Sequence, residues 1–501
     1  MTNGFPCMDL LSLERYRDLV GDWDAFAAYQ VRPLRPTIWT NTLRVTPGEL
    51  SGYLAADGIE AEPISWLPGG FRLPAGCAPG RSLGRLLGLF HIQEEVSMMP
   101  IPLLDPRPGE RLIDLCAAPG NKTVQAAVRM EDRGTVLAVD ANSYRVGLIS
   151  QSVERLGVTS IAILHQDAGN LPRAVGTFDR VLADVPCSCE GTVRKNPAIL
   201  LRSWRPGWRH NTQVAILHKA VQLCRPGGRI VYATCTYAPE ENEAVVDKVL
   251  RRPPSGSAVR VLPARIPGLV TSPGITEWRG ETYDPQLAGA MRIYPHQNDT
   301  GGFFIAVLEK SAADAGADEG RRAKHAPRPV AEVVERFDAE RFLAELEARF
   351  GVPRAIFDDV AIFRASAKRA SIAGRGLELP PRPPVWALGM PFFSTKSAFP
   401  RPASALARKL GRLARRNVVD LDDAQIAELL TRREVRLGAA QASACEGEGY
   451  VLPRYRGFVV TVARFLADGD GGVLRGAIPR LWTQTLADGL VDDEQNDSAR
   501  S

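Results

Sequence analysis

Two cysteines close short apolar runs, and they are the strongest candidates in this sequence for covalent chemistry. Cys187 follows the run FDRVLADVP at 178–186, and Cys235 ends the run GRIVYATC at 228–235. A thiolate is a strong nucleophile, whereas a buried thiol is a small packing residue. If the two runs are neighbouring strands of one sheet, the two thiols lie near each other. Spacing alone does not decide which of them would be the nucleophile.

Aspartates also stand at the ends of such runs. Asp140 ends TVLAVD, Asp167 follows SIAILH at 160–165, and Asp184 lies close to Cys187. One aspartate in such a place is usually a cap or turn residue. Three on successive strands would face one crevice, because open α/β sheets bind ligands outside the carboxyl ends of their strands. Carboxylates there favour a cofactor with hydroxyls, amine donors and a positive centre over one with a pyrophosphate.

A turn of small residues follows the first run, RLIDLC at 111–116. Small side chains let a ligand approach the backbone, Gly120 can adopt conformations that other residues avoid, and the expected helix presents free N–H groups. An ordinary strand–turn–helix connection is the alternative interpretation. With the aspartates, the turn gives these candidate cofactor-binding residues: Cys116, Ala117, Ala118, Pro119, Gly120, Asn121, Lys122, Asp140, Asp167 and Asp184.

The elements that position these residues follow an alternating pattern. The apolar runs are separated by the helical stretches NKTVQAAVRM at 121–130 and ANSYRVGLISQSVERLG at 141–157, and FFIAVLEK at 303–310 resembles a last strand. Short apolar strands separated by helices predict parallel strands with right-handed crossovers. The predicted fold class is therefore α/β with a doubly wound sheet. The pattern does not give the strand order.

Composition predicts several parts along the 501 residues. After a linker at 312–330, residues 331–485 regain a hydrophobic pattern. The pattern predicts a helix at 338–351 and a β-hairpin within 450–476, and therefore a small mixed domain. The predicted segments are 1–105, rich in Pro and Gly; 106–311, with the sheet; 312–330, a linker without large apolar side chains; 331–485; and 486–501, a polar tail.

The overall composition excludes some classes of protein. Hydrophobic residues make up 45% and charged residues 24%, as in soluble globular chains. No run of eighteen apolar residues and no signal-like start occur, so we expect a cytoplasmic protein. Eight cysteines are too few for a disulfide scaffold, and without Cys-x-x-Cys and with only six histidines we expect no metal site. The thiols of Cys116, Cys189 and Cys224 are expected to serve packing.

Two segments carry clustered positive charge, while the net charge is only +5. Residues 194–210 hold five Lys or Arg and no acid, interleaved with Trp204 and Trp208, a pattern that suits a flexible single strand of nucleic acid. For residues 194–210 the alternative interpretation is a solvated loop, and for a second basic segment, 401–419, it is a solvated helix face. That segment, 401–419, is predicted to face phosphates through Arg401, Arg408, Lys409, Arg412, Arg415 and Arg416.

The motifs of this chain resemble, in order, those of the Sun-type RNA (cytosine-5)-methyltransferases. They include LCAAPGNKT, LAVDANSYRV, HQDAGNL, ADVPCSCEGTVRKNP and YATCTYAPEENE, preceded by IWTNTLRVTP and HIQEEVSMMP and followed by PHQNDTGGFFIAVLEK. The resemblance covers residues 35–310. TCTYAPEEN and GYVLPRYRGF make the chain most similar to the bacterial ribosomal RNA small subunit methyltransferase F group, although Thr300–Phe303 looks more like other members.

The resemblance implies a class I methyltransferase sheet, an N-terminal α+β RNA-binding segment and a C-terminal PUA-like α+β domain. The implied cofactor is S-adenosyl-L-methionine, with residues 116–122 at its methionine part, Asp140 at its ribose and Asp167 at its adenine. The implied partner is RNA, small-subunit rRNA first and tRNA as the alternative. The alternative to an enzyme is a catalytically inactive protein that keeps the methyltransferase fold and serves as an RNA-binding ribosome assembly factor.

The resemblance also assigns the chemistry that spacing left open. It makes Cys235 the nucleophile that adds to C6 of cytosine, and Cys187 the second thiol that helps to remove the C5 proton. Asp184 is expected to hydrogen-bond the cytosine edge, and Lys122 is expected to lower the pKa of a nearby thiol. This chain departs from the family at Cys189, where a glycine is usual after the Pro-Cys-Ser motif.

Overall fold

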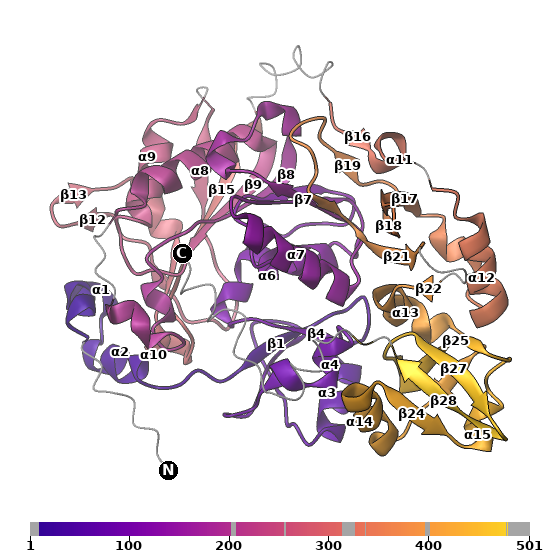
Figure 1. The fold of residues 1–501 in the computed structure, drawn as a ribbon. Helices are drawn as coiled ribbons and strands as arrows, with labels where there is room; N and C mark the ends of the chain where they lie inside the picture. The colour runs from indigo at the N-terminus through magenta and orange to yellow at the C-terminus, as the bar shows by residue number, and fades with distance from the viewer. Residues whose placement is uncertain are drawn as a thin grey trace.

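The computed structural model of this chain describes residues 10–201, 207–254, 257–312, 326–335, 337–395, 401–476 and 478. An N-terminal part, a central sheet flanked by helices and a C-terminal part rich in strands follow one another along the chain (Figure 1). Most of the predicted linker, the predicted tail, and Trp204 and Arg205 of the first basic segment lie outside the described residues. Within the described residues, no helix has the length and apolar character needed to cross a bilayer.

A mixed sheet of ten strands, counted over the described residues, forms the central part. Its core is five parallel strands in the order β7-β6-β5-β8-β9, and the remaining strands are antiparallel to their neighbours. The predicted runs therefore all form strands, but the last one, 303–310, reverses direction. The bounds are β5 Arg111–Asp114, β6 Thr135–Asp140, β7 Ile161–His165, β8 Phe178–Asp184, β9 Cys224–Thr234, β10 Val259–Leu262, β11 Ser272–Pro273, β14 Met291–Ile293, β15 Phe303–Lys310 and β20 Ala387–Leu388.

Helices cover both faces of this sheet. Consecutive residues of a strand point to opposite faces, and Leu112 and Ile113 of β5 accordingly belong to two different buried clusters. One cluster includes residues of α8 and α9, and the other includes residues of α5, α6 and α7. Burial on both faces explains why these strands are unbroken apolar runs. The helices are α5 Pro100–Leu104, α6 Asn121–Arg129, α7 Ser143–Leu156, α8 His210–Leu223, α9 Glu243–Arg251 and α10 Pro295–Asn298.

The N-terminal part contains a small antiparallel sheet in the order β2-β3-β1-β4. The helices α1 and α2 lie apart from that sheet. Phe26 of α2 packs edge-on against Tyr237 and His296. The start of the chain therefore contacts the segment that follows β9. The bounds are α1 Arg17–Val20, α2 Trp23–Gln30, β1 Thr37–Thr40, α3 Pro47–Ala56, β2 Glu62–Pro63, β3 Gly70–Arg72, α4 Leu83–Leu86 and β4 Phe90–Ile92.

The described C-terminal part contains two larger sheets, β17-β18-β21-β22 and β23-β25-β27-β28-β24 with β26 (Phe458–Val459) added to β25, and a two-stranded sheet of β16 (Arg328–Pro329) and β19 (Glu378–Leu379). The predicted helix at 338–351 forms as α12, and the predicted hairpin forms between β27 and β28, where Asp468 pairs with Gly471. The bounds are α11 Val330–Val333, α12 Glu340–Phe350, β17 Val360–Ser366, β18 Arg369–Gly374, β21 Met390–Ser394, β22 Arg401–Pro402, α13 Ser404–Leu410, β23 Val418–Asp420, α14 Asp423–Arg432, β24 Glu434–Leu437, α15 Ala439–Ala442, β25 Gly449–Tyr455, β27 Ala463–Asp468 and β28 Gly471–Gly476.

The second basic segment joins the C-terminal part to the rest of the molecule. The Lys409 ammonium lies 3.2 Å from the Asp132 carboxylate and donates to the Gly157 carbonyl at 2.7 Å. Arg412 pairs with Glu49 at 3.0 Å, and the Arg408 side chain is buried. Lys409 and Arg412 therefore bind other parts of the chain, and Arg408 is buried, whereas the sequence predicted that all three would face phosphates. Their partners are far away in sequence.

Candidate functional site

A cavity of about 200 Å³ opens at the carboxyl ends of β5, β8 and β9. This is the edge where the sequence places its candidate residues, and the location agrees with ligand binding in open α/β sheets. The lining also includes residues from the N-terminal part and from the start of β15. The lining residues are Leu34, Gln93, Glu94, Ser97, Asp114, Cys116, Ala117, Ala118, Pro119, Asn121, Lys122, Asp184, Gly191, Thr192, Lys195, Cys235, Gly301, Gly302 and Phe303.

The turn between β5 and α6 forms one side of this cavity. Asp114 is buried at its start and accepts a hydrogen bond from the Thr123 hydroxyl at 2.7 Å. Burial raises the pKa of the Asp114 carboxyl to about 7. Gly120 does not line the cavity; its φ of 106° places it against α7, and an added Cβ would lie 3.1 Å from Cα of Ile149. A side chain there would be strained and would press on that helix.

Two of the predicted strand-end aspartates hold turns, and Asp140 does so in contact with the lining residue Ala118. Asp140 at the end of β6 accepts from the backbone N–H groups of Ala118 at 3.2 Å and Asn142 at 3.0 Å. Asp167 caps the short helix that follows it, since its carboxylate accepts from the Gly169 N–H and from the Asn170 amide, both at 2.9 Å. Asp167 is exposed and Asp140 is buried. Their contacts with a cofactor stay predictions.

Lys122 and Asp184 form an ion pair on the cavity surface. The Lys122 ammonium lies 2.7 Å from Asp184 Oδ2 and donates to the Ser97 hydroxyl at 2.8 Å. The ammonium also lies 5.4 Å from the centre of the Phe303 ring. Lys122 is buried, and Asp184 keeps 27% of its side chain exposed. The partner of Lys122 is thus a carboxylate rather than a thiol, and the exposed part of Asp184 is available to a ligand.

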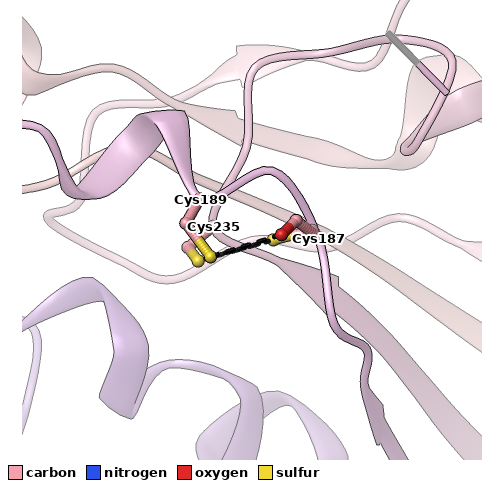
Figure 2. A group of neighbouring side chains, drawn as sticks. All are labelled: Cys187, Cys189 and Cys235. Atoms are coloured by element: carbon pink, nitrogen blue, oxygen red, sulfur yellow. Dashed lines mark hydrogen bonds between the residues drawn. The ribbon is translucent and has the colours of Figure 1, made fainter. Parts of the chain in front are cut away.

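Three thiols gather where β8 and β9 end (Figure 2). Cys187 Sγ lies 3.5 Å from Cys235 Sγ and 4.0 Å from Cys189 Sγ. The expected proximity of Cys187 and Cys235 is confirmed, because the two strands are parallel neighbours with Asp184 opposite Ala233. The third thiol, which we expected to serve packing, belongs to the same group. Cys235 lines the cavity, whereas Cys187 is buried behind it.

The contacts within this group raise the pKa values of Cys187 and Cys235. Hydrogen bonds with Cys189 and with Cys235, and then burial, raise the pKa of the Cys187 thiol well above its ordinary value. The hydrogen bond with Cys187 lowers the pKa of the Cys235 thiol, but the contact with Cys189 and burial outweigh it, so this pKa is also raised. The expectation that Lys122 depresses a thiol pKa therefore does not describe this arrangement.

A buried carboxyl fixes the two loops that carry the thiols. Glu190 accepts hydrogen bonds from the Tyr16 hydroxyl at 2.8 Å and from the Thr236 hydroxyl at 2.7 Å. Thr236 follows Cys235 directly, and its hydroxyl is also 2.6 Å from the Ser188 hydroxyl. Burial raises the pKa of Glu190 to about 7. Side chains from three distant segments thus set the position of the nucleophile candidate.

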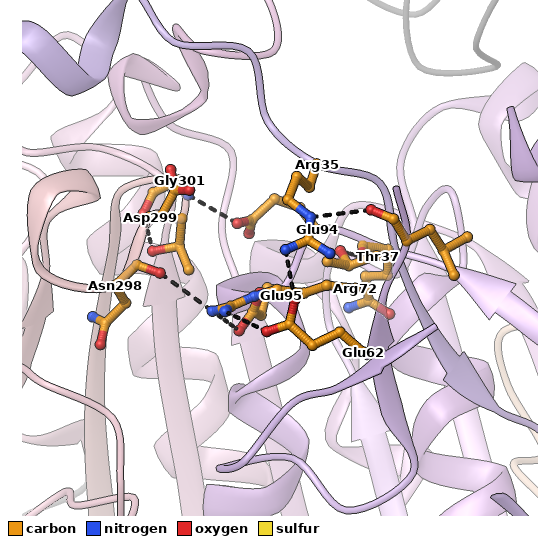
Figure 3. A network of polar contacts seen from close by, with 12 residues as sticks. Arg35, Thr37, Glu62, Arg72, Glu94, Glu95, Asn298, Asp299 and Gly301 are labelled. Atoms are coloured by element: carbon orange, nitrogen blue, oxygen red, sulfur yellow. Dashed lines mark hydrogen bonds and ion pairs between the residues drawn. The ribbon is translucent and has the colours of Figure 1, made fainter. Parts of the chain in front are cut away.

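A second polar network holds the N-terminal part against the loop before β15 (Figure 3). Arg72 makes a two-pronged ion pair with Glu95, at 2.8 and 2.9 Å, and also donates to the Asn298 carbonyl. Glu94 accepts from the Gly301 N–H at 2.9 Å, and both residues line the cavity. The cavity is therefore completed by two segments, one before β5 and one before β15, whose contacting residues are 207 residues apart.

Sequence reasoning assigned no role to several of the lining residues. Gln93, Glu94 and Ser97 lie within the segment HIQEEVSMMP, and Gly301, Gly302 and Phe303 lie within the closing motif. Both segments carried the family resemblance, so the signal was present as a motif. The apolar periodicity of the strands gave no reason to place either segment at this edge of the sheet.

Comparison with known proteins gives consistent matches. A family profile described as "16S rRNA methyltransferase RsmB/F" matches residues 101–309. A tRNA (cytosine(49)-C(5))-methyltransferase from Pyrococcus abyssi is 38% identical over 303 residues, which cover 60% of this chain and 95% of that protein. Ribosomal RNA small subunit methyltransferase F from Klebsiella pneumoniae is 37% identical, over 58% of this chain and 60% of that protein.

The fold has a solved counterpart. The crystal structure of a methyltransferase homolog protein from Pyrococcus horikoshii superposes with a TM-score of 0.53 and 30% sequence identity. The match covers 60% of this chain and 95% of that chain. A Rossmann-like methyltransferase sheet is thus common to both, while the remaining part of this chain has no counterpart in that match.

Proposed function

This chain belongs to the RsmB/F family of RNA (cytosine-5)-methyltransferases, and we propose that it methylates C5 of a cytosine in small-subunit ribosomal RNA through a cysteine adduct. The observation that carries the proposal is the 3.5 Å separation of Cys187 and Cys235 beside the cavity that the 116–122 turn lines. The nucleophile candidate Cys235 and the Asp184 carboxylate line one pocket, and the second thiol lies directly against Cys235, which suits addition to C6 and loss of the C5 proton.

The cavity fits S-adenosylmethionine as the cofactor. When bound, it supplies an electrophilic methyl group. Ala117, Ala118 and Pro119 give a small apolar surface that admits close approach to the backbone, and Asp184 supplies negative charge near a sulfonium. Asp140 is held by two backbone N–H groups beside this turn, which suits a carboxylate that meets ribose hydroxyls. Asp167 is proposed to contact the adenine amino group.

Each residue at this site is proposed to perform a different step of the reaction. The Cys235 thiolate forms a bond to C6 of cytosine, which makes C5 nucleophilic. After methylation of C5, the Cys187 sulfur, which has first lost its own proton to solvent, takes the C5 proton as a thiolate. The C5–H electrons then form the C5–C6 double bond, and the Cys235–C6 bond breaks to return the Cys235 thiolate. Asp184 hydrogen-bonds the cytosine edge while charge develops on the ring, and its pairing with Lys122 at 2.7 Å fixes its orientation. General acid–base help of this kind contributes ~10²–10⁴-fold.

The choice of rRNA rests on how the relatives map onto this chain. The match to the tRNA enzyme covers 95% of that enzyme but only 60% of this chain, so the remainder of this chain has no counterpart in it. The chain spans 60% of the length of the Klebsiella rRNA enzyme that it matches. A tRNA substrate is the second candidate, because the tRNA enzyme is the relative with 38% identity.

Substitution of the nucleophile tests the mechanism. Cys235→Ala is expected to abolish both methylation and any covalent protein–RNA complex, whereas Cys187→Ala is expected to accumulate the complex because the C5 proton is no longer removed. Cys445→Ala, at a thiol in the C-terminal part, is the matched control. Methylation by Cys235→Ala at the wild-type rate would end the proposed mechanism.

Bisulfite mapping tests the substrate. RNA from cells with and without the gene is compared at every cytosine of the small-subunit rRNA and of the tRNAs. Loss of one rRNA signal supports the proposal. Loss of a tRNA signal alone replaces rRNA by tRNA and leaves the chemistry unchanged.

A further inference from the structure

The sequence spacing of the cysteines does not predict a metal site, but the fold brings three of them together. The sulfur atoms of Cys187, Cys189 and Cys235 all lie within 4.8 Å of one another. Zinc–sulfur bonds are about 2.3 Å long, so two sulfurs on one tetrahedral ion lie about 3.8 Å apart. The Cys187 sulfur lies 3.5 Å from that of Cys235 and 4.0 Å from that of Cys189. The cluster therefore already has nearly the spacing of a three-thiolate site.

We propose that these three cysteines form a binding site for one thiophilic d¹⁰ cation, of which Zn(II) is the representative. Soft thiolate ligands select such ions over Mg(II) or Ca(II), which prefer oxygen. Ions reach the sulfurs through the cavity that Cys235 lines. Binding breaks three S–H bonds, forms three metal–sulfur bonds and passes three protons to water, which leaves a site with a net charge of −1 for a divalent ion.

The backbone at Cys189 supports a site of three ligands. Cys189 has φ 63° and ψ 19°, a left-handed conformation that side chains rarely adopt and that glycine adopts without strain. The turn is closed by hydrogen bonds from the Thr192 N–H at 2.9 Å and hydroxyl at 2.8 Å to the Cys189 carbonyl. It aims the thiol back at Cys187, to whose carbonyl it donates at 3.4 Å. A glycine would satisfy this backbone and leave only two thiols.

The consequence for activity rests on the proposed function. A Cys235 sulfur that is bound to a cation donates electron density to the metal and is held in the cluster, so it is a much weaker nucleophile toward C6 of cytosine. The bound ion therefore blocks methylation reversibly, and a chelator restores it. Acid weakens the block, because protons compete with the ion for the three sulfurs.

Titration of the reduced full-length protein with Cd(II) tests the site without any methylation assay. Cd(II) bound to thiolates absorbs in the ultraviolet, so we expect the band to saturate at one equivalent and to decrease with a large excess of Zn(II) but not with Mg(II). Cys189→Gly should weaken binding by at least ~10–100-fold, the loss that follows even from removal of an outer partner of a metal ligand. Cys189→Ser tests the thiol itself, and Cys445→Ser is the control with a thiol removed elsewhere.

The outcomes separate the site from the proposed function. No band in the wild type, or equal binding by Cys189→Gly, overturns the site. If the site is real, Zn(II) inhibits methylation by the wild type, EDTA reverses the inhibition, and Cys189→Gly needs correspondingly more Zn(II). A protein that binds Cd(II) in this way but methylates no RNA would contradict the proposed function while the metal site stands.

Discussion

The cavity has two sides that are built differently. The turn side, residues 114–122, is held by bonds within a short stretch and from the adjoining strand, such as the Gly120 N–H to the Ala117 carbonyl at 2.7 Å. The thiol side, residues 187–192 and 235–241, depends on side chains from far away, since Glu190 binds Tyr16 and Thr236. Lys122 on the turn side is paired with the Asp184 carboxylate of β8, whereas the raised pKa values of Cys187 and Cys235 on the thiol side favour their neutral forms.

This difference teaches where each side is vulnerable. The backbone holds the geometry of the turn side, so removal of a charge from the Lys122–Asp184 pair should reduce function without unfolding the turn. The thiol side is sensitive to remote substitutions, because Glu190 binds Tyr16 and Thr236. Both sides are sensitive to pH, because burial raises the pKa of Asp114 and of Glu190 to about 7.

The largest effect is expected from Asp184→Asn, which removes the charged partner of Lys122 on the turn side. The amide leaves the buried Lys122 ammonium without its carboxylate and removes the acceptor for the cytosine edge, so kcat/KM should fall ~10²–10⁴-fold. Steady-state methylation kinetics measure it, with circular dichroism to confirm folding. Activity within twofold of the wild type would show that the ion pair is structural only.

Glu190→Gln should change the stability of the thiol side. The Glu190 pKa is raised from 4.5 to about 7 in the folded protein. A raised folded pKa gives stability that is complete below the unfolded pKa and is lost as pH rises through the folded pKa. Across this window the wild type should lose on the order of 3 kcal/mol relative to Glu190→Gln. Urea unfolding at several pH values measures this, and parallel curves would refute it.

The pH profile of the reaction tests the ionisation of the nucleophile. Because the pKa of the Cys235 thiol is raised, only a small fraction is thiolate near neutrality. The value of kcat/KM should therefore rise about tenfold per pH unit over roughly pH 7 to 9. Alkylation of Cys235 by iodoacetamide should follow the same slope. A rate that is flat in this range would mean that substrate binding, and not the resting protein, sets the thiolate fraction.

The smallest effect is expected from Asp167→Asn. Asparagine caps a helix as well as aspartate does, so the stability should stay within about 0.5 kcal/mol of the wild type. If the carboxylate binds the adenine amino group, KM for S-adenosylmethionine should rise roughly two- to tenfold, the equivalent of one ordinary hydrogen bond, with kcat unchanged. An unchanged KM would leave Asp167 with the capping role alone.

The parts of the site that were predictable from the sequence are those fixed by local pattern. The apolar runs gave the strands of the sheet, and parallel neighbours then had to bring Cys187 and Cys235 together. Cys189 was different, because its place in the cluster depends on a left-handed turn and on a neighbour, Glu190, that binds Tyr16 at a separation of 174 residues.

Charges were the least predictable feature, because a sequence shows a charge but not its partner. Lys122 was expected beside a thiol, and its ammonium instead contacts Asp184 and Ser97. Lys409 and Arg412 were expected to face phosphates, but they bind Asp132 and Glu49, more than 270 residues away. The folded distances decide such pairings, and apolar periodicity carries no information about them.

One short strand ties the C-terminal part to the central sheet. β20 pairs with β7, and the flanking N–H groups of Trp386 and Gly389 donate to the Ile163 and Ile161 carbonyls. A chain cut within 312–330 would leave that side of β7 with backbone donors and acceptors facing water, which is a template for self-association. The strand β20 thus covers an edge of the central sheet that would otherwise be open to pairing, and we expect the full chain to aggregate less than a chain truncated before β20.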